Sequence, residues 1–393
     1  MKKIAILTAT RAEYGLLSPI MKKLQLNPEI DVRVVVTGAH LSPEFGMTVN
    51  EIKEDGISID KEIEILLSSD TPVSISKSMG LAIISFSEYF NESKPDALMV
   101  LGDRYETLAV CIAAMNSCIP IIHLHGGEAT EGLIDDAVRN SITKLSFLHF
   151  TSTDVFRNRV IQMGESPDRV YSVGAMGVEN ALSIPTISQE ELEKSININL
   201  SDNYAVLTFH PVTLENNTAE EQVNELLNAI SNYPDITFLC TKANADTNGR
   251  IINECLEAYS KSNPNLFLVD SLGVVRYLSA VKNATFVIGN SSSGLIEIPS
   301  FKIPTINIGN RQKGRILAQS VISCAPDASS ITDAIKKALS PSFRDSLLNM
   351  SNPYGDGKTS DKIVNITTDY LLNNKLKVMK AFYDLPFEDT KCE

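Results

Sequence analysis

The sequence predicts an α/β protein built from two Rossmann-like, doubly wound domains that face each other across a cleft. Three observations lead to this prediction. Short apolar runs alternate with longer amphipathic stretches along the chain, a pattern typical of a parallel sheet covered by helices on both faces. The alternation stops once, in a polar stretch near residue 180, and then restarts. The 393 residues are also too many for one ordinary core and suit two domains.

The apolar runs of the first domain predict its strands. Runs that are apolar throughout, rather than alternating with polar residues, are typical of strands buried on both faces of a sheet. The predicted strands are Ile4–Thr8, Val32–Thr37, Ala97–Leu101, Ile121–Leu124, Phe147–Thr151 and Val170–Val173. Because parallel sheets bind ligands at the carboxyl ends of their strands, we expect functional side chains directly after these runs.

The second domain repeats the pattern. Its predicted strands are Tyr204–Phe209, Thr237–Cys240, Leu266–Val269, Phe286–Ile288, Thr305–Ile308 and Val321–Cys324. A helical pattern from about Lys362 to Tyr383 follows and is expected to pack back onto the first domain. The predicted domains are therefore residues 1–180, completed by a C-terminal helix in residues 362–393, and residues 181–361.

Composition excludes several classes of protein. A net charge of −13 argues against nucleic-acid binding, and an anionic substrate must be held by local groups rather than by the overall field. No window approaches the roughly 18 uncharged apolar residues of a membrane span. The first residues run directly into a strand without a signal core, so we expect a cytoplasmic protein. The six cysteines lack Cys-x-x-Cys spacing and are expected to be mostly buried free thiols.

The stretch Asn283–Glu297 predicts a phosphate site. An apolar run stops at Gly289 and Asn-Ser-Ser-Ser-Gly leads into a helical pattern. Backbone N–H groups, the hydroxyls of Ser291 and Ser292 and the positive helix end would surround one anion. Glu297, about two turns into that helix, could accept hydrogen bonds from ribose hydroxyls. The alternative is that Ser and Asn only cap the helix.

Titratable side chains follow two successive strands of the first domain. Asp103 follows Ala97–Leu101, and His125 and Glu128 follow the next strand. With Asp135 and Arg139 nearby, they supply the groups that general acid–base chemistry needs. Taken singly, Asp103 could cap a helix and the imidazoles could bond to backbone. Their clustering at successive strand ends favours a catalytic role.

Neither a metal nor an organic cofactor is expected. The chain has five histidines, and the His-x-His pair at His123 and His125 is alone a weak metal signal. His149 lies inside an apolar run and is expected to be a core residue. The first strand ends without Gly-x-Gly-x-x-Gly, which excludes a nicotinamide loop. Arg11, at the following helix start, could bind a phosphate or pair with Glu13.

Other polar residues follow strands of the second domain. His210, Asn244, Asp246 and Arg311 each stand shortly after an apolar run. Together with the Asn283–Glu297 stretch, they could form a subsite for a nucleoside diphosphate.

These residues belong to a series of motifs that resembles a known family. The motifs are Thr10-Arg-Ala-Glu-Tyr, Gly38-Ala-His, Gly102-Asp-Arg, His123-x-His-Gly-Gly-Glu, Asp135-Asp-x-x-Arg-x-Ser-Ile-Thr-Lys, Gly289-Asn-Ser-Ser-Ser-Gly and Asn307-Ile-Gly-x-Arg-Gln. Their order, from residue 2 to about residue 385, resembles the hydrolysing UDP-N-acetylglucosamine 2-epimerases of bacterial sialic acid synthesis.

The resemblance implies a GT-B-like fold, a homodimer or homotetramer, and UDP bound to the second domain. It implies that Asp103 and Asp135 are catalytic and that Ser291 and Ser292 hold the diphosphate. The other substrate- or UDP-binding positions that it implies are Arg11, His40, Arg104, Arg139, His210, Asn244, Asp246, Glu297 and Arg311. The implied reaction eliminates UDP from UDP-N-acetylglucosamine to give a glycal, which water converts to N-acetylmannosamine.

One position departs from the family pattern. Much of the family has a catalytic glutamate where this chain has His125, so either His125 or Glu128 takes over the proton transfer. Several rival functions stay open. The substrate could be a UDP-2,4-diacetamido-trideoxyhexose of legionaminic acid synthesis, and a GT-B glycosyltransferase could use the same UDP site. A non-hydrolysing epimerase and a nucleotide-sugar sensor are disfavoured by the motif forms and by the density of titratable groups.

Overall fold

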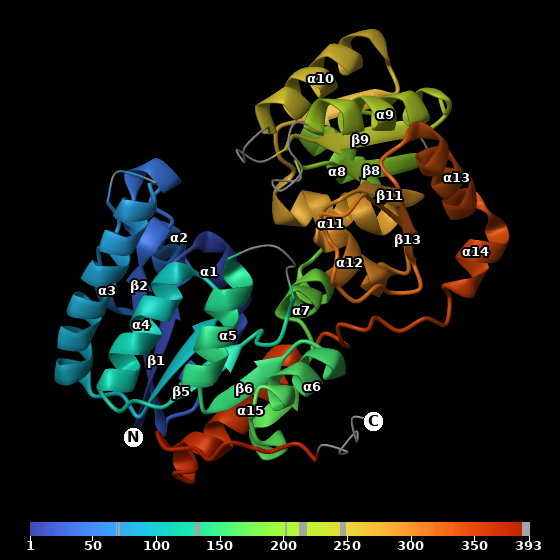
Figure 1. The fold of residues 1–393 in the computed structure, drawn as a ribbon. Coiled ribbons are helices and arrows are strands. Elements are labelled where there is room, and N and C mark those ends of the chain that lie inside the picture. Colours follow the sequence, from blue (N-terminus) through green and yellow to red (C-terminus); the bar gives the residue numbers. More distant parts are fainter. Residues whose placement is uncertain are drawn as a thin grey trace, which may run out of the picture. The chain divides into compact units, whose positions relative to one another are not determined.

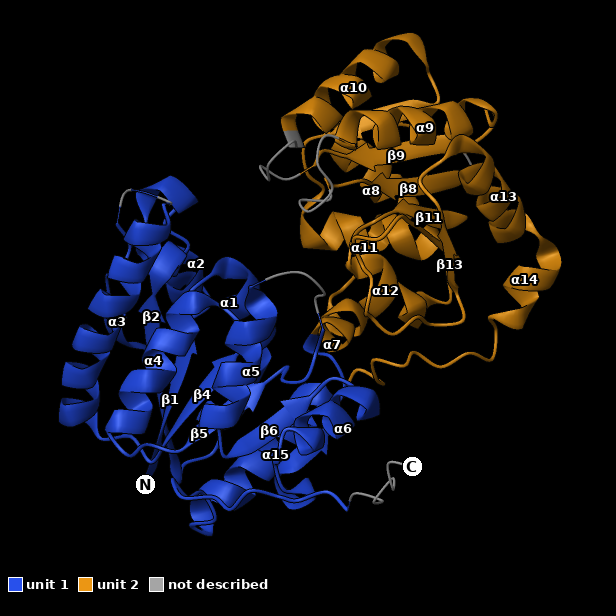
Figure 2. Ribbon diagram, in the orientation of Figure 1, with its two compact units in different colours: residues 1–129, 133–176, 358–393 blue, residues 130–132, 177–357 orange. Residues whose placement is uncertain are grey.

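In the computed structural model, the chain folds into two compact units, and each unit is built around one parallel β-sheet (Figure 2). Unit 1 comprises residues 1–129, 133–176 and 358–393, and unit 2 comprises residues 130–132 and 177–357. The residues that the structure describes are 1–67, 69, 71–129, 134–200, 203–211, 218–243 and 249–386.

The sheet of unit 1 has seven parallel strands in the order β3-β2-β1-β4-β5-β6-β7 (Figure 1). They are β1 (Lys2–Thr8), β2 (Ile30–Thr37), β3 (Ile59–Ile63), β4 (Ala97–Leu101), β5 (Ile121–Leu124), β6 (Leu148–Thr151) and β7 (Val170–Ser172). The order reverses between β1 and β4, and ligands bind at such a switch point in doubly wound folds.

Helices cover both faces of this sheet. Ile4 and Ile6 of β1 pack with α1 and α15 on one face, whereas Ala5 and Leu7 pack with α3 and α4 on the other. The helices are α1 (Arg11–Gln25), α2 (Val49–Glu54), α3 (Pro72–Ser93), α4 (Tyr105–Asn116), α5 (Asp135–Leu145), α6 (Asp154–Gln162) and α15 (Thr359–Leu372), with the 3₁₀ turns η1 (Gly38–Leu41), η2 (Pro43–Phe45) and η3 (Pro167–Arg169).

Unit 2 has a six-stranded parallel sheet in the order β10-β9-β8-β11-β12-β13. Its strands are β8 (Tyr204–Thr208), β9 (Thr237–Thr241), β10 (Leu266–Val269), β11 (Phe286–Gly289), β12 (Thr305–Ile308) and β13 (Val321–Cys324). The helices are α7 (Met176–Ser183), α8 (Gln189–Ile196), α9 (Ala219–Ser231), α10 (Gly249–Ser262), α11 (Gly273–Asn283), α12 (Ser293–Ile296), α13 (Ala328–Leu339) and α14 (Pro341–Ser346), with η4 (Ile298–Phe301). The predicted pair of doubly wound parallel sheets is confirmed.

Strand β3 was not predicted. Three consecutive charged residues stand between its two isoleucines, which is tolerated because β3 is the edge strand of the sheet and is only partly buried. Continuous apolar runs indicate central strands such as β4 and β5, but an edge strand of this kind has no such run.

The prediction of a helix as far as Tyr383 was wrong. Helix α15 ends at Leu372, and Asn374 takes a left-handed conformation with φ 53°. Residues 375–386, which we call the C-terminal strap, continue without helix. The strap is fixed by tertiary contacts, including a 2.9 Å hydrogen bond from the Tyr383 N–H to the Gly164 carbonyl.

His149 is a core residue, as predicted. It is completely buried, and its Nε2 lies 3.2 Å from Oε2 of the equally buried Glu165. Burial by itself raises the pKa of Glu165, but hydrogen bonds from His149, Lys144 and Lys380 lower it to about 2. Lys380 belongs to the C-terminal strap and donates to Glu165 Oε1 at 2.6 Å. Glu165 therefore fixes the strap to unit 1.

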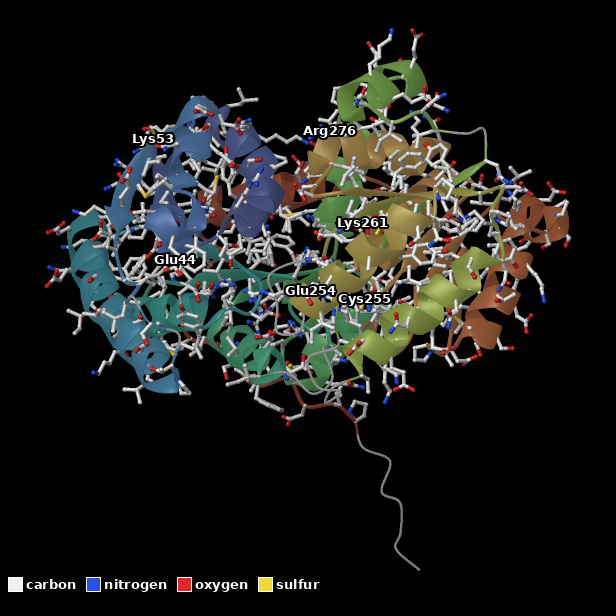
Figure 3. All side chains as sticks on the ribbon, turned by 90° about the horizontal axis from the view of Figure 1, so that it is seen from above. Glu44, Lys53, Glu254, Cys255, Lys261 and Arg276 are labelled. Carbon is white, nitrogen blue, oxygen red and sulfur yellow. The ribbon has the colours of Figure 1, made fainter. Side chains whose placement is uncertain are left out.

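The five cysteines in the described part of the chain are free thiols. Cys111 and Cys240 are buried, as expected, whereas Cys118 is exposed. Cys255 lies on α10, which also carries Glu254 and Lys261 (Figure 3). None of the described helices combines the length and apolar character that crossing a membrane requires.

Candidate active site

His123 fixes the loop that follows β4. It is completely buried, and burial lowers its pKa to about 3, so the ring is neutral at physiological pH. Its Nε2 lies 2.8 Å from the Gly102 carbonyl and its Nδ1 3.2 Å from the Thr143 hydroxyl. Because a carbonyl oxygen only accepts, Nε2 carries the proton. His123 is thus a structural support for the loop that presents Asp103.

Arg139 holds Asp103 in place. The Arg139 side chain is almost fully buried on α5, and its Nη2 is paired with Asp103 Oδ2. Its Nη1 donates to the Glu128 carbonyl at 2.6 Å and to Asp136 Oδ1 at 2.7 Å. One guanidinium therefore connects the loops after β4 and β5 with the first turn of α5.

Asp135 lies at the start of α5, in the field of this cluster. Burial and the negative charge of Asp103 raise the pKa of Asp135, while Arg139 and Arg104 lower it. The site therefore combines a carboxylate paired with Arg139 and a carboxyl that keeps its proton to higher pH. Two carboxyls in different environments are a common arrangement for acid and base roles.

The loop after β5 pairs His125 with Glu128. His125 Nδ1 lies 3.3 Å from Glu128 Oε1, and the buried Ser152 hydroxyl donates to the same oxygen at 2.8 Å. Among the described residues, His125 Nε2 is buried without a hydrogen-bond partner. His125 also has a left-handed backbone, φ 67°, which is rare for a residue with a side chain. Such strain gathers at functional sites.

Gly127 allows this loop to form. Its φ is +78°, and a Cβ atom there would lie 2.4 Å from the Phe156 carbonyl oxygen. The Gly127 carbonyl in turn accepts a 2.8 Å hydrogen bond from Arg159 Nη1. Gly127 is therefore needed for close packing against α6.

Arg11 and His40 contact protein groups rather than the cluster around Asp103. Arg11 lies at the start of α1, and its exposed side chain donates to Glu51 Oε2 at 3.1 Å. The pairing considered with Glu13 is wrong, because Glu13 is buried, forms a capping box with Thr10 and also accepts from the Ala9 N–H. His40 is completely buried, and its ring nitrogens lie 2.9 Å from the Thr8 hydroxyl and 2.8 Å from the Thr48 hydroxyl.

In unit 2, Asn290 connects three loops at the carboxyl edge of the sheet. It is 1% exposed, and its side chain binds both the N–H and the carbonyl of His210. Its own carbonyl accepts from Arg311 Nη1 at 3.1 Å and from Gln312 Nε2 at 2.9 Å. Asn290 and Gln312 were not among the predicted site residues, although Asn290 belongs to the predicted phosphate motif. Two predicted binding positions, His210 and Arg311, are thereby brought to one edge.

The loop after β11 differs in structure from the predicted phosphate site. Helix α12 has only four residues, so its dipole is small and the backbone N–H groups of the loop matter more. Among the described residues, the N–H groups of Ser291 and Ser292 donate to no protein acceptor. Gly289 makes this turn possible, because a Cβ there would lie 1.9 Å from the Thr208 carbonyl oxygen.

Glu297 was expected about two turns into a helix, but it lies directly after the single turn of α12. Pro299 explains the short helix, because proline has no N–H to continue the α-helical hydrogen bonds and the chain turns into η4 instead. Burial raises the pKa of the Glu297 carboxyl, and its Oε2 has no hydrogen-bond partner among the described residues. A Cβ atom on Gly177 would lie 2.4 Å from Oε1. Glu297 is therefore closely packed against the first turn of α7.

Two predicted positions, Asn244 and Asp246, lie outside the described residues. Within the described ranges, no group of three or more His, Cys, Asp or Glu side chains is placed to hold a metal ion.

Comparisons with known proteins agree on one family. A family model described as UDP-N-acetylglucosamine 2-epimerase matches residues 22–368. The chain is 40% identical over 390 residues to the GDP/UDP-N,N'-diacetylbacillosamine 2-epimerase (hydrolyzing) of Campylobacter jejuni, covering 98% of this chain and 99% of the relative. It is also 40% identical over 387 residues to the polysialic acid biosynthesis protein P7 of Escherichia coli, covering 98% of each.

A solved structure has the same fold. The UDP-GlcNAc 2-epimerase of Neisseria meningitidis, bound to UDP-GlcNAc, superposes with a TM-score of 0.78 at 20% identity, covering 94% of this chain and 100% of that chain. This likeness confirms the predicted GT-B-like fold class.

Proposed function

The chain belongs to the UDP-N-acetylglucosamine 2-epimerase family, and from this premise we propose that it is a hydrolysing 2-epimerase of a UDP-linked 2-acetamido sugar. The first candidate substrate is UDP-N-acetylglucosamine, with N-acetylmannosamine and UDP as products. One observation carries the proposal. Asp103, paired with Arg139, lies in the field of Asp135, whose pKa is raised, at the carboxyl end of the unit 1 sheet.

The proposed chemistry has two steps. In the first, the bond between C1 and the UDP oxygen breaks and the C2 proton is removed, which leaves a C1=C2 double bond. In the second, water adds its hydroxyl to C1, and a proton returns to C2 from the opposite face. The C2 proton is only weakly acidic, so departure of UDP must lead and leave an oxocarbenium-like centre.

Asp103 and Asp135 are proposed to exchange protons at the sugar. Asp103 accepts from the Arg139 guanidinium, which holds its carboxylate in place, and we assign it the role of base. Asp135, whose pKa is raised by burial and by the charge of Asp103, is assigned the role of proton donor. Their different environments would give them opposite roles.

His125 and Glu128 are proposed to act together where the family has a glutamate. Glu128 Oε1 lies near His125 Nδ1 and is itself held by Ser152. A carboxylate at Nδ1 selects the tautomer that carries its proton there and leaves Nε2 as the acceptor. In the described part of the chain, Nε2 is the ring atom without a protein partner. We therefore assign to Nε2 the proton transfer of the family's glutamate, and to Glu128 the role of orienting the His125 ring.

UDP is proposed to bind unit 2. The backbone N–H groups of Ser291 and Ser292 and the Arg311 guanidinium would stabilise the diphosphate as it leaves, and such electrostatic stabilisation is usually the largest catalytic contribution. Arg311 is already held by the Asn290 carbonyl. The Glu297 carboxyl, whose Oε2 is unpaired among the described residues, is proposed to bind the ribose hydroxyls.

A second candidate substrate is a UDP-2,4-diacetamido-trideoxyhexose. The name of the Campylobacter relative favours it, whereas the name of the Escherichia coli relative favours the sialic acid pathway. The two sugars share the reacting carbons C1 and C2 and differ at C4 and C6, so the same proton-transfer groups would serve either one.

A product assay tests the proposal. Purified protein is incubated with each UDP-sugar without an acceptor, and UDP and the free sugar are quantified by chromatography. We expect equimolar UDP and free 2-epimerised sugar from one of the two substrates. UDP release only after an acceptor is added would indicate a glycosyltransferase, and a UDP-linked mannose epimer as the product would indicate a non-hydrolysing enzyme.

A further inference from the structure

Glu106 is a fully buried acid within the proposed active site. It is the second residue of α4 and follows the loop that carries Asp103 and Arg104. Its Oε1 accepts a 2.8 Å hydrogen bond from Arg104 Nε. The Glu106 side chain is 0% exposed and that of Arg104 is 43% exposed, so this ion pair runs from the interior of unit 1 to its surface.

Arg104 keeps most of its donors available. Among the residues that the structure describes, only its Nε forms a hydrogen bond. Burial lowers the pKa of Arg104, but the charges of Glu106 and Glu13 outweigh this effect and raise it, so the guanidinium stays charged. A guanidinium that is hydrogen-bonded only through Nε still presents two amino groups in a rigid plane. This geometry binds an anion through two parallel hydrogen bonds.

Stability does not account for this arrangement. In the part of the chain that the structure describes, neither Oε2 of Glu106 nor Oε1 of Glu13, both buried, has a hydrogen-bond partner. Both acids adjoin Ala9 at the end of β1, since Glu13 accepts from the Ala9 N–H at 2.8 Å and a Cβ on Gly38 would lie 3.0 Å from the Ala9 carbonyl and 3.5 Å from Glu106 Oε1. Burying carboxyl oxygens without partners is costly. Such groups are typical of functional sites at strand ends.

We infer that Glu106 is a positioning residue for substrate binding: it holds Nε of Arg104 so that the two amino groups of Arg104 face an anionic group of the nucleotide sugar. This inference rests on the proposed function and adds Glu106 to the same site. The competing explanation is an ion pair that only stabilises the first turn of α4, where an acidic residue is favourable.

A double-mutant cycle separates the two explanations. The variants are Glu106→Gln, Arg104→Ala and their combination, with KM and kcat measured for the UDP-sugar that the wild type converts. We expect Glu106→Gln to weaken substrate binding and so to raise KM about tenfold. The kcat of this variant should stay within about twofold of wild type. Adding Glu106→Gln to Arg104→Ala should raise KM no further, because Glu106 acts through Arg104.

Two further variants guard against a loss of folding. Glu106→Asp keeps the charge one methylene further away and should recover part of the lost affinity. Glu165→Gln is the matched control, since Glu165 is also completely buried and bonded to basic groups but does not belong to the proposed site. It should lower the unfolding midpoint and leave KM unchanged.

Each result has one meaning. The inference would be overturned if Arg104→Ala and Glu106→Gln had additive effects on KM. It would also be overturned if Glu106→Gln lowered the unfolding midpoint but kept the wild-type KM. In both cases, turnover by the wild type would still support the proposed function. If the wild type converts neither UDP-sugar, the proposed function fails. The same cycle is then measured in the dissociation constant of UDP-N-acetylglucosamine, where additivity or the absence of binding would overturn the inference.

Discussion

Asn290 holds the backbone of His210 through two hydrogen bonds. Its Oδ1 accepts from the His210 N–H at 2.7 Å, and its Nδ2 donates to the His210 carbonyl at 2.8 Å. The two residues are 80 positions apart in the chain, on the loops that follow β8 and β11. This clamp fixes the edge of the unit 2 sheet to which we assign the diphosphate.

We predict that Asn290→Ala weakens UDP binding at least tenfold. The substitution removes the two hydrogen bonds that Asn290 makes to the His210 backbone, and each such bond contributes about 1 kcal/mol to stability. Isothermal titration with UDP and denaturant unfolding measure the two effects. Asn232→Ala is the control, because among the described residues the Asn232 side chain bonds only to carbonyls of the helix that it follows. Wild-type affinity for UDP in Asn290→Ala would show that the clamp does not shape the binding loop.

Glu128→Gln is expected to lower kcat by about 10²–10⁴, the usual contribution of a positioned proton-transfer group, with little change in KM. The amide still accepts from Ser152 but no longer favours the proton on His125 Nδ1. His125→Asn should lower kcat similarly, and the double variant should be no slower than the slower single variant. Losses that multiply in the double variant would mean that the two residues act independently.

Arg139→Leu should destabilise unit 1 by on the order of 3 kcal/mol, because it leaves charged partners without their cation. Urea unfolding measures the loss, and turnover should fall with it because Asp103 is no longer held. Arg157→Leu is the control, since Arg157 donates to two backbone carbonyls only. It should lower stability but not kcat, and equal kcat losses in both variants would contradict a specific role for Arg139.

The buried carboxyl of Glu13 should make the free energy of unfolding depend on pH. Burial raises its pKa from 4.5 to about 7, so between these values the folded state binds more protons than the unfolded state. The free energy of unfolding therefore falls as pH rises through this window, by on the order of 3 kcal/mol. Glu13→Gln keeps an acceptor for the Ala9 N–H and should flatten this slope in denaturant unfolding at pH 5 to 8. Parallel curves for wild type and variant would exclude Glu13 as the source.

The fold was predictable where local patterning and burial agree. Three of the four residues of β5 are apolar, and they identify the strand correctly because it is buried on both faces. The end of α15 was not predictable in the same way. Val378, Met379 and Phe382 continue a helical spacing past Leu372. However, Phe382 packs against Gly164, which lies far earlier in the chain. Tertiary contacts of this kind have no local signal.

The site was predictable at its strand ends and less so in its supports. Asp103 and His125 follow apolar runs, which is a local signal. Ser152 and Glu106 do not stand out, because their roles depend on partners brought together by folding. The short α12 does have a signal in the sequence, since Pro299 lacks the N–H that would continue the helix.

The most direct test is turnover in D₂O, followed by proton NMR, with UDP-N-acetylglucosamine and the UDP-diacetamido sugar in separate reactions. Removal of the C2 proton and its replacement from solvent require deuterium at C2 of the free sugar. We predict that one substrate yields UDP and a free 2-epimerised sugar fully deuterated at C2. Release of a sugar that keeps its C2 proton, or no turnover of either substrate by protein that binds UDP, would contradict elimination and hydration at this site.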